Sequence, residues 1–446
     1  MSHADLGTDI EKSTIRRVTR RIMPFLIAAY LINFLDRTNV GFAAAGMEED
    51  LGIGPAAYGL GAGIFFIAYF IFEVPSNVAL YRFGARIWIA RIMITWGIIA
   101  GLLAFIQTVE HFYILRFLLG AAEAGFYPGV IFYLSLWYPV RYRARMTSIF
   151  FLGIPIAQVI GAPLSGGLII LGDSMGFDGW RVMYLVEAMP ALILGVVTIF
   201  YLTDRPEKAK WLSAAQQEWL ITEMARDQEA ARKVTGIDEP SKWSQVKAVI
   251  RMPMVWALAG ILFCMTAGSN ALNFFFPSVV ETFKTSFGVE TNVLTNGFIV
   301  AIPYAFAAAA MILWGRRSDR TMERRFHGGG AAILSGLAIV SALLLDNPIA
   351  IVVGFIVLAS GIYSAQVVFW SIPARLLTGV AAATGIGLIN SVGNLSGFVG
   401  PYLTGWLYET SGSYLLAFGV IATLVVIGGI GFIALLSRRR IRDAIG

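Results

Sequence analysis

The sequence is poor in the residues on which disulfides, metal clusters and soluble surfaces depend. Its 446 residues include one cysteine and three histidines, and only 14% of them are charged, whereas 57% are hydrophobic. The single cysteine, Cys264, excludes an intramolecular disulfide and a cysteine metal cluster. Soluble domains carry about 25% charged residues, so this chain has too little polar surface to cover a soluble globule. We therefore expect lipid to cover much of the folded molecule.

Reactive groupings are also scarce. His3, His111 and His327 lie near predicted helix ends or loops, so no histidine is deep enough to relay protons. The sequence shows no nucleophile paired with a base, no cluster of metal ligands and no phosphate-binding glycine loop. These absences argue against a membrane enzyme, and no metal or cofactor is expected. The one long polar segment is too short to supply the extra domain of a membrane-bound sensor.

Long apolar runs dominate instead. Twelve runs have about the 20 residues that a helix needs to cross a bilayer, which predicts an all-α membrane protein. The predicted spans are 22–45, 57–81, 88–107, 112–137, 146–171, 182–203, 254–278, 292–315, 329–346, 349–372, 377–406 and 414–437. Residues 204–252 divide them six and six and are interpreted as a linker rather than a surface-bound helix. The predicted domains are 1–203 and 253–446, joined by 204–252.

Basic residues are distributed unevenly among the connections. Alternate connections carry most of them, with nine between residues 204 and 252, and both termini are basic. The intervening connections are acidic, and their only basic residues are Arg181 and Lys284. Because basic residues favour the cytoplasmic side of a membrane, both termini are predicted to be cytoplasmic. The net charge of +6 is thus an orientation signal, and no nucleic-acid partner is expected.

The two halves contain matching motifs. Gly161-Ala-Pro-Leu-Ser-Gly166 in the fifth span corresponds to Gly400-Pro-Tyr-Leu-Thr-Gly405 in the eleventh, about 240 residues later. Weaker matches occur at other equivalent spans. Together they predict a duplicated six-helix unit, with two pseudo-symmetric bundles. Repeats of this kind, with a site between them near the middle of the bilayer, are the architecture of secondary transporters.

Four ionisable residues lie deep in the predicted spans. Asp36 and Arg37 are adjacent in the first span, and Arg116 and Glu123 share one stripe of the fourth. An ionised group at mid-bilayer costs about 2.5–3.5 kcal/mol on insertion scales, and such groups are functional by default. Arg116 and Glu123 are about 10 Å apart along the helix axis, so each is expected to use another partner, for which Asp36 is the candidate. The alternatives are static ion pairs, Asp36 with Arg37 or Arg116 with Glu123.

These positions predict two kinds of role. Asp36 and Glu123 are expected to carry protons, because no histidine is embedded, and Arg116 is expected to be the cation that they gain and lose. Successive side chains on a helix diverge by about 100°, so Arg37 is free to face elsewhere. There its guanidinium is expected to bind a carboxylate through two parallel hydrogen bonds.

The chain resembles the major facilitator superfamily, and within it the anion:cation symporter family. Gly315-Arg-Arg-Ser-Asp319-Arg320 matches the loop motif of the superfamily, and the first-half copy lacks the acid because Tyr81 stands in its place. Leu35-Asp36-Arg37-Thr-Asn39, Phe72-Glu73-Val-Pro75-Ser76-Asn77 and Glu123-Ala-Gly125-Phe-Tyr-Pro128 match at the level of the family. The resemblance implies uptake of a small organic anion with protons, and less so with sodium, by a monomer in the inner membrane. An anion exchanger or a drug exporter is the alternative.

The resemblance also organises the remaining candidates. A loop or gating role is implied for Gly315, Asp319 and Arg320, and packing or gating for Glu73, while Glu187 is expected to snorkel. Substrate contacts are expected from Tyr69, Gln158, Asn270, Trp370, Ser371 and Asn390, each of which is alternatively a contact between helices. Tyr69, Trp370 and Asn390 rank highest. Val367-Val368-Phe369 precedes Trp370 without hydroxyl groups, which favours a less hydroxylated or aromatic acid over a polyol acid.

Overall fold

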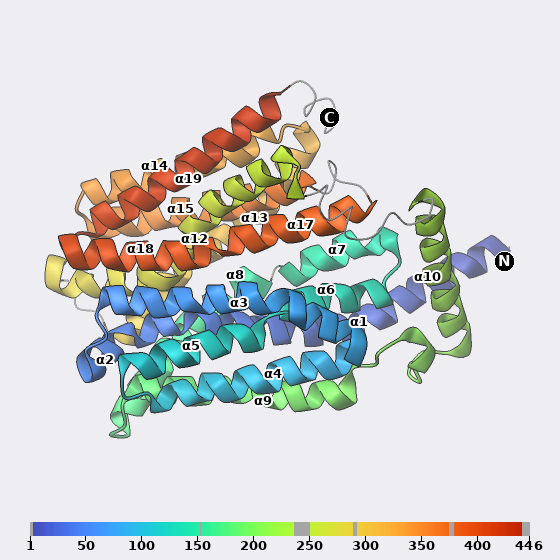
Figure 1. Cartoon of the computed structure of the whole chain (residues 1–446), viewed down its shortest axis with the longest axis horizontal. Coiled ribbons are helices and arrows are strands. Elements are labelled where there is room, and N and C mark those ends of the chain that lie inside the picture. Colours follow the sequence, from blue (N-terminus) through green and yellow to red (C-terminus); the bar gives the residue numbers. More distant parts are fainter. Residues whose placement is uncertain (1–2, 152, 236–249, 289–291, 374–378, 439–446) are drawn as a thin grey trace.

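The computed structural model describes residues 3–151, 153–235, 250–288, 292–373 and 379–438, and within these ranges the regular elements are all helices. Figure 1 shows most of the long helices lying side by side with their axes in similar directions. The first group consists of α1 (His3–Thr38), α2 (Val40–Leu51), α3 (Pro55–Phe83), α4 (Ala85–Leu102), η1 (Leu103–Phe105), α5 (Val109–Glu123), α6 (Phe126–Trp137), α7 (Val140–Phe151), α8 (Gly153–Ser174) and α9 (Gly179–Tyr201).

The second group follows a connecting segment that contains η2 (Pro206–Lys208) and α10 (Ala214–Thr235). It consists of α12 (Pro253–Phe287), α13 (Val293–Thr321), η3 (Phe326–Gly330), α14 (Ala331–Leu344), α15 (Pro348–Trp370), α17 (Gly379–Asn394), α18 (Ser396–Ser411) and α19 (Tyr414–Ser437). The start of α1 and the end of α19 lie toward the same end of the molecule, here called the terminal end (Figure 1). The start of α3 lies at the other end, here called the opposite end.

Eleven helical segments in the described ranges are long and apolar enough to cross a membrane, and they coincide with eleven of the predicted spans. The exception is the predicted span 377–406, which is occupied by α17 and α18, two helices of sixteen residues each that meet at Leu395. Each is shorter than the about 20 residues that a crossing needs. Eleven crossings therefore have structural support, and the twelfth remains a prediction.

Large apolar side chains cover the outside of the helices. Phe200 on α9 is 81% exposed and Ile349 on α15 is 74% exposed, and many other aliphatic side chains are exposed to a similar degree. A soluble protein rarely exposes a continuous apolar surface of this extent. Together with the length of the helices, this surface identifies a multi-pass membrane protein, as the composition predicts.

The two groups contact one another mainly along two helix crossings, α3 with α18 and α8 with α13. The repeated sequence motif lies at both crossings. In α8, Gly166 packs against the backbone of Val293, the first residue of α13, and in α18, Gly405 packs against the backbone of Pro55, the first residue of α3. A Cβ atom on either glycine would overlap that backbone. The motif therefore repeats because each copy lets a helix of one group approach the start of a helix in the other, near the opposite end.

The fourth predicted span is broken near its middle. α5 ends at Glu123, and Gly125 then adopts a left-handed conformation with φ of +89° before α6 begins. A Cβ atom on Gly125 would also overlap the hydroxyl of Ser76 on α3. Breaks of this kind occur in transporters where helices line a binding site, and this one places Glu123 at the end of a helix.

We expect the substitution Gly125→Ala to destabilise the protein and to displace Glu123. A left-handed backbone costs a residue other than glycine about 1–3 kcal/mol, and the overlap with Ser76 adds to this cost. A lower melting temperature of the purified variant in detergent would show the effect. The matched control is Gly260→Ala in α12, where a Cβ atom meets nothing within 4 Å. An equal melting temperature for Gly125→Ala and Gly260→Ala would contradict this interpretation of the break.

Candidate functional site

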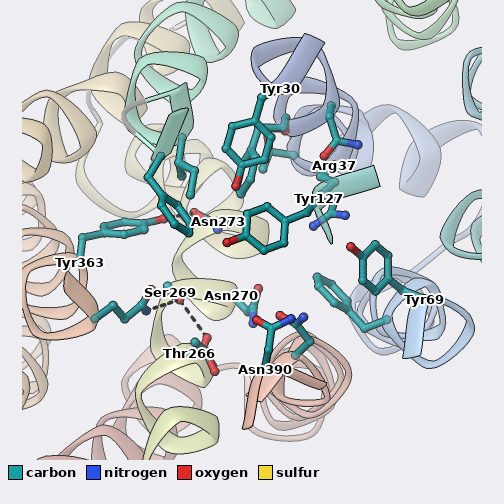
Figure 2. Close-up of a pocket in the computed structure, with 18 of the residues that line it drawn as sticks. Tyr30, Arg37, Tyr69, Tyr127, Thr266, Ser269, Asn270, Asn273, Tyr363 and Asn390 are labelled. Atoms are coloured by element: carbon teal, nitrogen blue, oxygen red, sulfur yellow. Dashed lines mark hydrogen bonds between the residues drawn. The ribbon is translucent and has the colours of Figure 1, made fainter. Parts of the chain in front are cut away.

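A cavity of about 160 Å³ lies between the two helix groups. Its walls combine tyrosines from the first group with amide and hydroxyl side chains from the second, and Figure 2 shows Arg37 and Tyr69 across the cavity from Tyr363. The lining residues are Tyr30, Asn33, Phe34, Arg37, Thr38, Phe66, Tyr69, Tyr127, Phe151, Ile154, Leu262, Thr266, Ser269, Asn270, Asn273, Phe274, Tyr363, Gln366, Trp370, Asn390 and Asn394. An engineered cavity of about 150 Å³ in another protein holds benzene, so this cavity suits a small molecule.

Arg37 is the one charged side chain among the residues that line the cavity. Its Nε donates a hydrogen bond of 2.8 Å to Oε2 of Glu123, which also accepts one of 2.7 Å from Nδ2 of Asn33. Glu123 is fully buried, whereas 18% of the Arg37 side chain is exposed. The guanidinium also lies over the ring of Tyr69 at 4.9 Å. The site thus presents one positive charge to the cavity and holds a carboxylate behind it.

Asp36 points away from Arg37, as the helical offset of adjacent residues predicts. Its Oδ2 accepts a hydrogen bond of 2.8 Å from Nε1 of Trp96 on α4, and Asp36 is 1% exposed. Its other oxygen, Oδ1, has no hydrogen-bond partner among the described residues. The expected contact of Asp36 with Arg116 or Glu123 was wrong for this conformation, because the carboxylate turns toward α4.

Arg116 is also fully buried but bonds to the backbone. Nε and Nη2 donate to the carbonyl oxygens of Gly61 and Ala62 on α3, both at 3.3 Å, and Nη1 has no partner in the described ranges. Its guanidinium lies 5.0 Å from the ring centre of Phe65, and that of Arg37 lies 5.2 Å from the same centre. Phe65 therefore joins the two arginines, although neither predicted carboxylate partner contacts Arg116 here.

Glu187 is a further buried carboxylate that the sequence analysis misplaced. It is 2% exposed, and its two oxygens accept hydrogen bonds of 2.9 Å from Asn39 Nδ2 and 2.7 Å from Ser165 Oγ. Snorkelling was therefore the wrong expectation. Asn39 and Ser165 belong to motifs noted in the sequence, but the spacing of those motifs gives no sign that they meet on one carboxylate.

A chain of hydrogen bonds crosses between the groups beside the cavity. Thr38 Oγ1 donates to Gln158 Oε1 at 3.0 Å, and Gln158 Nε2 donates to Asn273 Oδ1 at 3.1 Å. The hydroxyls of Tyr304 and Tyr363 donate to the same Asn273 oxygen at 2.7 and 3.2 Å. Gln158, which was predicted to contact substrate, instead links the two groups, and Asn273 is the point at which the chain branches.

Four of the other predicted substrate residues line the cavity, namely Tyr69, Asn270, Trp370 and Asn390. Ser371 does not line it, because its hydroxyl is bonded to Arg324 and to the carbonyl of Val368. The cavity is also lined by Tyr30, Asn33, Thr266 and Gln366, which no pattern in the sequence singles out. Tyr127, which the sequence places on the same helical stripe as Arg116 and Glu123, also lines the cavity.

Three of the predicted gating residues, Glu73, Gly315 and Arg320, do not line the cavity. Glu73 accepts a hydrogen bond of 3.2 Å from Ser391 Oγ and so links α3 to α17. In the loop motif, Gly315 and Arg320 lie toward the end of α13, and the side chain of Asp319 is not among those described. Just beyond, partial burial opposes ionisation of Glu323, but hydrogen bonds from Phe326 and His327 lower the pKa of its carboxyl.

Membrane-spanning helices in two groups around a small polar cavity, with buried charges behind it, define a membrane transporter rather than an enzyme. Comparison with known proteins agrees: residues 26–401 match the Major Facilitator Superfamily. The chain belongs to that family.

Three individual similarities bear on the chain. A putative tartrate transporter from Agrobacterium vitis is 46% identical over 95% of each chain. A quinolone resistance transporter from Acinetobacter baumannii is 40% identical, over 94% of this chain and 96% of that one. Among solved structures, a bacterial homolog of the human lysosomal transporter Spinster, inward-facing and occupied, superposes with a TM-score of 0.73 at 17% identity, over 95% of this chain and 97% of that one. At that identity the structural match supports the fold alone.

Proposed function

We propose that this protein imports a small organic anion together with protons, by alternating access. The observation that carries the proposal is the pair formed by Arg37 and Glu123, at 2.8 Å, with Arg37 facing the cavity and Glu123 behind it. A substrate carboxylate that binds Arg37 competes with Glu123 for the guanidinium. Glu123 then keeps only the hydrogen bond from Asn33.

That competition couples the anion to a proton. A carboxylate buried without a cation favours its protonated form, so anion binding at Arg37 promotes protonation of Glu123. The linkage is reciprocal, and a proton on Glu123 releases Arg37 for the anion. Asp36 and Arg116 remain our second proton carrier and its switching cation. In this proposal, the hydrogen bond from Trp96 to Asp36 and the bonds from Arg116 to the backbone belong to one conformation of the transport cycle. Asp36 and Arg116 contact one another in another conformation.

The cavity favours a hydroxylated acid. The expectation of an aromatic acid rested on Val367, Val368 and Phe369. None of these three residues lines the cavity, whereas the neighbouring Gln366 does. Gln366 Nε2 donates to Ser269 Oγ at 3.2 Å, and Asn270 Nδ2 donates to Ser396 Oγ at 3.1 Å. Amides and hydroxyls of this kind match hydroxyl groups on a ligand. The similarity to a putative tartrate transporter supports the same class.

A second candidate function is export of a carboxylate-bearing drug. The 40% identical quinolone resistance transporter favours it, and the cavity contains Tyr30, Tyr69 and Tyr127, whose rings can stack on an aromatic ligand. The polar wall of the second group and the small volume favour the hydroxy acid.

The orientation and domain organisation are part of the proposal. The basic connections favour cytoplasmic termini in the inner membrane, with domains 1–203 and 253–446 joined by residues 204–252 and acting as a monomer. Contacts between the two groups near the opposite end argue against an outward-open state. There Tyr58 donates to the carbonyl of Phe274 at 2.8 Å, and the Ala56 amide donates to Glu409 at 2.8 Å.

A ligand screen tests the substrate class. Purified protein is heated with tartrate, a hexonate, nicotinate or a quinolone, since a ligand at about 100 times its Kd stabilises a protein by about 2.7 kcal/mol. We expect the largest rise in melting temperature with the short hydroxy acid. Stabilisation by the quinolone alone would favour the exporter and contradict the proposed import of a hydroxy acid.

A further inference from the structure

A second pocket lies at the terminal end, outside the cavity. It has a volume of about 530 Å³ and is formed by one face of α1, the last residue of α9 and the segment before α10. Its lining residues are Ser13, Arg16, Arg17, Arg20, Arg21, Tyr201 and Trp211. The spacing of the residues from α1 places them on a single helical stripe. The other face of that helix, with Ile15 and Val18, is buried.

This basic pocket holds positive charge that no acidic side chain in the described part of the chain balances. Arg16, Arg17 and Arg20 are exposed, no carboxylate lines the pocket, and none of its arginines forms a salt bridge with a described residue. Glu11, on the same helix, is already paired with Arg141 at 2.8 Å. Four guanidinium groups gathered in this way repel one another and favour an anion.

The aromatic wall of the basic pocket is fixed in place. The guanidinium of Arg21 lies 4.7 Å from the ring centre of Tyr201 and 5.2 Å from that of Trp211. The Tyr201 hydroxyl donates to the backbone oxygen of Arg21 at 2.9 Å, and Trp211 Nε1 donates to Thr203 Oγ1 at 3.2 Å. Tyrosine and tryptophan rings of this kind are typical of the boundary between lipid and water.

An apolar track leads away from the basic pocket along α9. Ile193, Val196, Val197 and Phe200 recur at helical spacing and are exposed by 61%, 49%, 36% and 81%, respectively. They lie on the membrane-spanning helix whose last residue, Tyr201, lines the pocket. A molecule with an anionic head and long apolar chains would contact both the arginines and this track, whereas a free phosphate ion would contact the arginines alone.

We propose that the basic pocket binds the phosphate headgroup of an anionic phospholipid, whose acyl chains lie along the exposed face of α9. Arginine suits this role because its planar donors match phosphate oxygens in pairs. The lipid would belong to the leaflet at the terminal end, where it would hold the start of α1 against the membrane.

Native mass spectrometry of the detergent-purified full chain, titrated with phosphatidylglycerol, tests this proposal. The test variant is the double substitution Arg17→Gln/Arg20→Gln. The matched control is Arg316→Gln/Arg317→Gln, which removes the same charge from exposed positions in the second group. Two basic residues at an anionic membrane surface together contribute about 30-fold in affinity, so we expect the test variant to bind phosphatidylglycerol about 30-fold more weakly. Phosphatidylcholine and 10 mM inorganic phosphate, added separately, identify the chemistry that is recognised.

The proposal predicts bound phosphatidylglycerol on the wild-type chain and on the control variant, and little phosphatidylcholine on either. Melting temperatures measured without lipid show whether the test variant is folded, which its exposed positions lead us to expect. Equal lipid binding by the test and control variants would overturn the proposal. Binding of inorganic phosphate as strong as that of phosphatidylglycerol would also overturn it, because that result would reassign the pocket to a free anion.

Discussion

Replacing Glu123 by glutamine is expected to abolish accumulation of the anion against its gradient while leaving exchange of labelled for unlabelled anion intact. Glutamine keeps the shape of the side chain and still accepts a hydrogen bond from Asn33. Unlike a carboxyl group, its amide neither binds nor releases a proton near neutral pH. The anion then binds at Arg37 without a coupled proton. Proteoliposomes with an imposed pH gradient should take up labelled substrate only until the inner and outer concentrations are equal.

The matched control for this substitution is Glu49→Gln, an exposed position in α2. We expect the control to accumulate substrate as the wild type does. If Glu123→Gln also accumulates substrate normally, Glu123 has no part in coupling and the role of its contact with Arg37 is structural.

Replacing Arg37 by alanine is expected to remove anion binding. Arg37 is the one cationic side chain that lines the cavity in the described part of the chain. Truncating one member of a buried, hydrogen-bonded charge pair between two binding partners costs about 2–5 kcal/mol of binding free energy. Loss of the pair between Arg37 and the substrate carboxylate therefore predicts a loss of anion affinity of about 30-fold or more. The substitution Arg37→Lys should recover part of the affinity, because lysine restores the charge but not the paired donors of arginine.

Binding of labelled substrate to purified protein measures this loss directly. Arg145→Ala removes an exposed arginine from the same helix group and should leave the affinity unchanged. Because alanine at position 37 also leaves Glu123 without its cation, the double variant Arg37→Ala/Glu123→Gln separates folding from binding. Normal affinity in Arg37→Ala would return Arg37 to a structural role.

The course of the helices could be predicted from the sequence because hydropathy and length decide it. The predicted span 182–203 corresponds to α9, from Gly179 to Tyr201, and the repeated glycine motif lies at both crossings between the groups. Hydropathy does not predict where a helix breaks within an apolar segment. The ends of α5 at Glu123 and of α17 at Asn394 depend on local backbone geometry within an apolar segment.

The partners of the charged residues could not be predicted in the same way. Spacing along one helix shows that Asp36 and Arg37 diverge, but it gives no information on what neighbouring helices present to each. Trp96 on α4 donates a hydrogen bond to Asp36. The ring of Phe65 on α3 lies beside the guanidinium groups of Arg37 and Arg116. Neither residue differs in the sequence from other apolar residues in its span, so only the packed helices reveal these contacts.

The central claim is that the anion and the proton are linked through Arg37 and Glu123. The most direct test is to add the preferred anion to proteoliposomes that enclose a pH-sensitive dye, with no pH gradient imposed. The account predicts that anion entry acidifies the interior in the wild type and that neither Arg37→Ala nor Glu123→Gln produces this acidification. Anion entry into wild-type vesicles with no change in internal pH, or with a rise in it, would contradict the account.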